Sequence, residues 1–67
     1  MDKLTYYKSY IAIVENKSLK NAAHYLNLSP SAVSKHLSLL EKYYGADLVI
    51  RDAKNIRITG EGKVFLS

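Results

Sequence analysis

Small polar side chains and one lysine dominate the stretch from residue 29 to residue 38. Several of them recur at steps of three and four, which would place them on one face of a helix. Hydroxyl and ammonium groups on such a face can form hydrogen bonds with the base edges and phosphates of double-stranded DNA. A face that meets only water is the alternative, although it would tolerate Glu, and no Glu occurs here. The predicted contacts on this helix are Ser29, Pro30, Ser31, Ser34, Lys35, His36 and Ser38.

The distribution of charge favours an anionic partner more strongly than the net charge of +4 does. None of the six acidic residues lies between positions 16 and 40, whereas Lys17, Lys20 and Lys35 do. Chance can produce such a gap in a short chain, but a surface that faces a polyanion would favour it. We therefore expect double-stranded DNA as the partner.

Two helix starts and one turn provide further candidate contacts. Ser18 and Ser29 are typical N-cap residues, and neither is followed three residues later by the Glu that completes a capping box. The N–H groups of such a helix start can bind a backbone phosphate, and an ordinary cap with water on the remaining groups is an equal alternative. Cations around the turn near residue 53 would touch phosphates, the minor groove or only solvent. The predicted phosphate and wing contacts are Ser18, Lys20, Asn21, Arg51, Lys54 and Arg57.

Several classes of function are excluded by what the sequence lacks. The 67 residues include no Cys, no metal-binding HExxH motif and no glycine-rich phosphate loop, and the two histidines are twelve positions apart. We expect no catalytic residue, no metal, no cofactor and no small-molecule site. Six tyrosines could stack on single-stranded bases, but three of them fall on apolar stripes that a core would use. No apolar run is long enough to span a bilayer, so we expect no membrane partner and a cytoplasmic, nucleoid-associated protein.

Periodicity and capping residues predict the elements that position these side chains. Apolar residues at positions 4, 7, 11 and 14 predict a first helix, with Ser9 on its polar side. A second helix begins after Ser18 and covers residues 19–26. A third begins at Pro30, and Gly45 ends it. The predicted inner stripe of this third helix is Val33, Leu37, Leu40 and Tyr44.

The pattern changes after Gly45. Short segments rich in β-branched residues at 48–50 and 56–58, separated by a polar turn, predict a two-stranded hairpin in which Ile56 and Ile58 face the core. Thr59 can cap one more helix, which begins near residue 60. The fold class is therefore mainly α: a winged helix-turn-helix with a three-helix core and a two-stranded β wing.

Several short motifs carry a family resemblance that covers nearly the whole chain. They are the pair Ala22-Ala23, the run Ala32-Val33-Ser34 followed by Lys35, the pair Leu40-Glu41 before Gly45, and Ile58-Thr59 before Gly62. With these motifs the sequence resembles the N-terminal DNA-binding domain of LysR-type transcriptional regulators, a bacterial family.

The resemblance implies a role for each segment. The third helix, about residues 30–44, would enter the major groove and read the operator, and the hairpin would be the wing. Residues 1–58 would form the DNA-binding domain, and residues 59–67 would begin the linker helix through which two such domains pair. A homodimer is implied for the intact protein, and a monomer is plausible for this chain alone. The predicted dimer contacts are Tyr6, Ile13, Val64 and Phe65.

Three positions depart from the usual family pattern. Pro30 and His36 stand where Gln is frequent, and Lys35 stands where Arg is frequent. Lysine makes a point contact where arginine grips two acceptors, so we expect a different base preference. The family's effector-binding domain has no counterpart in these 67 residues.

A second class of function also stays open, in which a winged helix docks onto another protein and binds no DNA. Such a module would show an apolar outer face on the third helix, where only Leu39 hints at one.

Overall fold

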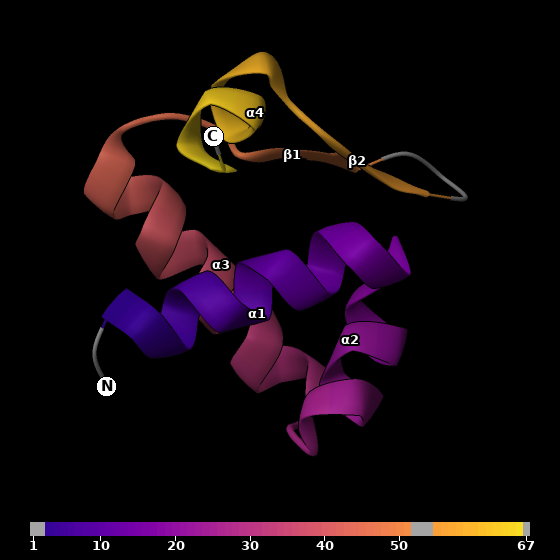
Figure 1. The fold of residues 1–67 in the computed structure, drawn as a ribbon. Coiled ribbons are helices and arrows are strands. Elements are labelled where there is room, and N and C mark those ends of the chain that lie inside the picture. The colour runs from indigo at the N-terminus through magenta and orange to yellow at the C-terminus, as the bar shows by residue number, and fades with distance from the viewer. Residues whose placement is uncertain (1–2, 52–54, 67) are drawn as a thin grey trace.

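The structure is a computed structural model that describes residues 3–51 and 55–66. Three helices form the core, and a two-stranded hairpin and a short fourth helix pack beside it (Figure 1). The predicted fold class is confirmed. In chain order, the elements are α1 (Lys3–Asn16), α2 (Leu19–Leu26), α3 (Pro30–Tyr44), β1 (Val49–Arg51), β2 (Ile56–Ile58) and α4 (Gly60–Leu66).

The predicted helix caps are confirmed. The side chain of Ser18 accepts a hydrogen bond from the Asn21 amide, and that of Ser29 accepts one from the Ala32 amide, each at 3.1 Å. Gly45 adopts the left-handed conformation, with a φ of 68°, and its N–H donates to the Glu41 carbonyl at 2.8 Å. These local interactions fix the start of α2 and both ends of α3.

The prediction for the inner face of α1 is only partly right. Tyr10, predicted on the inner side, is buried, but Leu4 is 58% exposed, and Ser9, predicted on the polar side, is buried. The large apolar residues of α1 spread over about half of its circumference, so its periodicity gives no narrow stripe. Its orientation is set instead by its central place, because α2, α3 and β2 all pack on it. The small side chains of Ser9 and Ala12 lie on the buried side.

The inner stripe of α3 is confirmed for its first three members and wrong for the fourth. Val33, Leu37 and Leu40 are buried. Tyr44 is 48% exposed, because it lies in the last turn of α3, and its ring packs edge-on against Phe65 with the ring centroids 4.5 Å apart.

The hairpin pairs its strands in an antiparallel register. Val49 lies opposite Ile58, and Ile50 lies opposite Arg57. Paired residues share a face of the ladder, so Val49 is buried and Ile58 half-buried on the inner face, whereas Ile50 and Arg57 are exposed. The inward direction predicted for the isoleucines of β2 agrees with their half-buried side chains.

Leu48 anchors the hairpin to the helical core through its backbone. Its N–H donates to a carboxylate oxygen of Glu41 at 2.7 Å, and its carbonyl accepts from the Tyr10 hydroxyl at 2.8 Å. Burial, with a smaller contribution from the negative charge of Glu41, raises the pKa of Tyr10 to about 12. The hydroxyl therefore stays protonated and able to donate at neutral pH.

Thr59 caps α4, as predicted. Its hydroxyl donates to the Asp47 carbonyl at 2.7 Å and accepts from the Gly62 amide at 2.9 Å. Gly62 is buried against Tyr10 and the Leu48 carbonyl. A Cβ at that position would lie 2.6 Å from the Leu48 carbonyl oxygen, so only glycine fits.

Candidate nucleic-acid interface

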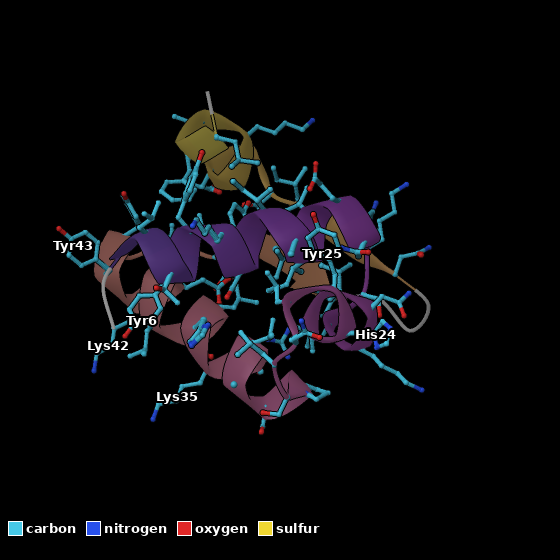
Figure 2. All side chains as sticks on the ribbon, turned by 60° about the horizontal axis from the view of Figure 1, so that its bottom comes forward. Tyr6, His24, Tyr25, Lys35, Lys42 and Tyr43 are labelled. Atoms are coloured by element: carbon cyan, nitrogen blue, oxygen red, sulfur yellow. The ribbon has the colours of Figure 1, made fainter. Side chains whose placement is uncertain are left out.

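The outer face of α3 carries cations and hydroxyl groups. Ser31, Lys35, Ser38 and Lys42 are exposed, and Ser34 is half-buried. Figure 2 shows Lys35 and Lys42 extending from α3 to the same side, away from the helical bundle. The one acidic residue of α3, Glu41, is half-buried and holds the Leu48 amide. The face is therefore positively charged and rich in hydrogen-bond donors.

The start of α3 is also exposed. Ser29 and Pro30 both meet solvent, and the Ser29 hydroxyl oxygen lies 3.2 Å from that of Ser31. Pro30 occupies the first helical position, where its missing N–H removes one donor that the helix start would otherwise offer. The predicted contacts Ser29, Pro30 and Ser31 thus lie together at one end of the outer face.

The prediction that His36 contacts DNA is wrong. Its side chain is 3% exposed, and its Nδ1 lies 2.8 Å from the Ser9 hydroxyl oxygen on α1. The sequence does contain a signal for this, because position 36 follows Val33 by three and precedes Leu40 by four, which is the spacing of the buried stripe. The polar character of histidine hides that signal.

At the start of α2, two of the three predicted phosphate contacts are exposed. Lys20 and Asn21 are exposed, and Ser18 is half-buried. The Asn21 amide already donates to the Ser18 side chain, and the Ala22 amide donates to the Ser18 backbone carbonyl at 3.0 Å. The N–H groups that precede Asn21 in the helix are the ones left for an outside acceptor.

The wing contributes two exposed cations to the described structure. Arg51 ends β1, and Arg57 lies on the outward face of β2 beside Ile50. Lys54, the third predicted wing contact, falls outside the described residues.

The predicted dimer contacts occupy different environments. Ile13 is fully buried inside its own chain, so that prediction is wrong. Tyr6 is half-buried and its ring lies 5.2 Å from that of His36. Phe65 packs against Tyr7 and Tyr44 of the same chain. Only Val64, at 75% exposed, offers most of its side chain to a partner.

Other kinds of site find little support in the described part of the chain. No group of three or more His, Cys, Asp or Glu residues able to hold a metal ion occurs there. None of its helices combines the length and the apolar character that crossing a bilayer requires.

Comparisons with known proteins agree with this geometry. The family model for "Bacterial regulatory helix-turn-helix protein, lysR family" matches residues 4–63. An uncharacterised HTH-type transcriptional regulator of Methanocaldococcus jannaschii, MJ0300, is 38% identical over 63 residues, which are 94% of this chain and 21% of that protein. The regulator PcaQ of Agrobacterium fabrum is 34% identical over 64 residues, 96% of this chain and 21% of that protein. The chain thus spans about a fifth of the length of these relatives.

Solved structures with the same fold include complexes with DNA. DarR of Vibrio fischeri, solved with DNA, superposes with a TM-score of 0.87 at 31% identity, covering 97% of this chain and 22% of that one. The DNA-binding domain of BenM bound to catB site 1 DNA superposes with a TM-score of 0.88 at 28% identity, covering 97% and 72%.

Proposed function

The chain belongs to the LysR family of bacterial helix-turn-helix regulators, and from this premise we propose that it binds double-stranded DNA sequence-specifically to regulate transcription. Members of this family are regulators and not enzymes. In the proposed complex, α3 enters the major groove and the wing touches the backbone or the minor groove. The observation that carries the proposal is the outer face of α3, which exposes two lysines and several hydroxyl groups and no carboxylate.

Individual side chains take separate roles in this proposal. Lys35, at the middle of the outer face, reads a guanine edge or grips a phosphate. Ser31, Ser34 and Ser38 are short enough to let the helix backbone approach the bases. Lys20, Arg51 and Arg57 contact phosphates and set the position of the domain on the duplex.

The alternative of a protein-docking winged helix gains no support. On the outer face of α3 the one large apolar side chain that reaches the surface is Leu39, at 36% exposed, while Tyr43 and Tyr44 are exposed in the last turn. A docking face built on this helix would need a wider apolar patch than one leucine provides.

The proposal extends to the assembly of the intact protein. Residues 1–58 would act as the DNA-binding domain, and α4 would begin a linker helix that joins two copies in a homodimer. The exposed Val64 on α4 supports this, and Phe65 beside it in the chain and Tyr6 on α1 remain further proposed contacts. The proposed place of action is the bacterial cytoplasm, at the nucleoid.

The test is selection of bound duplexes from a random pool, followed by titration of the best duplex at rising salt. We expect one enriched motif, with half-sites about 10 base pairs apart if two copies pair. The affinity should fall by about tenfold or more between 50 and 200 mM salt, because neutralised phosphates release counterions. A chain that binds no duplex at low salt would contradict the proposal.

A further inference from the structure

A buried polar contact joins the DNA-facing helix to α1. His36 lies on the inner side of α3 and Ser9 on the inner side of α1, and both are almost fully buried. Their side chains meet at 2.8 Å, between the His36 Nδ1 and the Ser9 hydroxyl oxygen. Tyr6, one turn earlier on α1, places its ring 5.2 Å from the imidazole at an angle of 44°. Figure 2 shows Tyr6 reaching from α1 toward α3.

The surroundings of His36 favour the neutral imidazole. Burial lowers the pKa of His36, and the positive charges of the chain's amino terminus and of Lys35 lower it further. On α1 the facing groups are Tyr6 and Ser9, neither of which is a carboxylate. The titratable groups of α2, Lys20, His24 and Tyr25, are all exposed. A proton on His36 would therefore put an unbalanced charge into the contact between α1 and α3.

We propose that His36 is a positioning residue for DNA binding: the neutral imidazole, held by Ser9 and Tyr6, fixes α3 against α1, and its protonation in mild acid loosens that contact and weakens binding. Lys35 precedes His36 directly, about 100° around α3, and it is exposed and extends away from the helical bundle (Figure 2). The orientation of the buried residue therefore sets where its DNA-facing neighbour lies. This inference rests on the proposed function.

The direction of the pH effect distinguishes this role from a direct contact. The pKa of His36 lies below its ordinary value of 6.5 in the folded chain. The stability that neutral His36 contributes is therefore fully present above about pH 6.5 and is lost as the pH falls below that value, because the unfolded chain binds the proton more readily. A histidine that faced phosphates would act in the opposite direction, since its positive charge would strengthen binding in acid.

The experiment measures the affinity of the 67-residue chain for the selected duplex from pH 7.5 down to pH 5.5, at constant ionic strength. Circular dichroism defines the range in which the chain stays folded. We expect the affinity of the unchanged chain to fall by about threefold or more, and by no more than about tenfold per pH unit, the limit for one proton. H36Q, which can still bond to Ser9 but cannot titrate, should bind well at pH 7.5 and lose most of this dependence. H24Q, at an exposed histidine, should keep it.

A second readout needs no DNA. In an NMR titration of the imidazole signals, His36 should take up its proton below its ordinary pKa of 6.5, and the amide signals around Ser9 should move with it. Failure of the unchanged chain to bind DNA at pH 7.5 would contradict the proposed function. The NMR titration would then still test whether His36 is held neutral against Ser9. Binding that is unchanged or stronger in acid, the full pH dependence in H36Q, or protonation of His36 at or above pH 6.5 would each overturn the positioning role.

Discussion

Adjacent residues on α3 perform opposite tasks. Lys35 is exposed on the outer face, and His36 is buried against Ser9. One residue along a helix is a rotation of about 100°, so neighbours differ sharply in what they meet. The same geometry explains why Val33 and Leu37 lie in the core while Ser31 and Ser38 meet solvent.

Removal of the Lys35 ammonium should change sequence preference. We expect Lys35→Ala to weaken binding to the best duplex by about 1–3 kcal/mol and to relax the preference at one base position, because a base contact contributes only with the right base. Arrays of duplexes with every single substitution would measure both effects. An equal loss for every sequence would reassign Lys35 to a phosphate.

Arg51 on β1 provides the matched comparison. It is exposed at the end of the strand, and we expect Arg51→Ala to weaken all duplexes about equally and to reduce the dependence on salt. The same arrays, read at two salt concentrations, test this. A change of base preference in Arg51→Ala would mean that the wing reads sequence directly.

Single residues show how far sequence could predict the candidate site. The outward direction of Ser31, Lys35 and Ser38 follows from periodicity, and the structure confirms it. His36 is predicted on the surface but lies in the core, because its spacing indicates the core while its polarity indicates the surface. Its hydrogen-bond partner, Ser9, lies 27 residues away, and no local pattern reveals such a pair.

At the scale of elements, capping residues determined the boundaries well. Ser18, Ser29 and Thr59 each accept a hydrogen bond at the helix start that the sequence predicted. These interactions are local, so they can be predicted from neighbouring residues. The face that α1 buries could be predicted only in part, because packing by α2, α3 and β2 decides it.

The close approach of α4 to the core depends on one glycine. We expect Gly62→Ala to destabilise the chain by about 1–3 kcal/mol, because the added methyl group would clash with the Tyr10 hydroxyl and the Leu48 carbonyl. Gly60→Ala is the matched control, since a Cβ there meets nothing within 4 Å. Chemical denaturation of both variants would measure the difference, and equal stabilities would show that α4 does not pack as described.

At the scale of the whole molecule, one small core supports one exposed helix. The chain has 67 residues and a net charge of +4, and its buried side chains come from α1, α2, α3 and the start of the hairpin. The acid-free stretch between residues 16 and 40 contains α2 and most of α3. The surface that lacks acidic residues is therefore the surface that α2 and α3 would turn toward an anionic partner.

The most direct test of this arrangement is an NMR map of the chain, labelled with ¹⁵N, as the selected duplex is added. We expect the largest changes in amide signals at Ser29 and from Ser31 to Ser38 on α3, with smaller changes at Lys20, Arg51 and Arg57. Binding of the duplex with α3 unperturbed, and with the changes concentrated on α4 around Val64, would contradict the central claim that α3 is the helix that enters the groove.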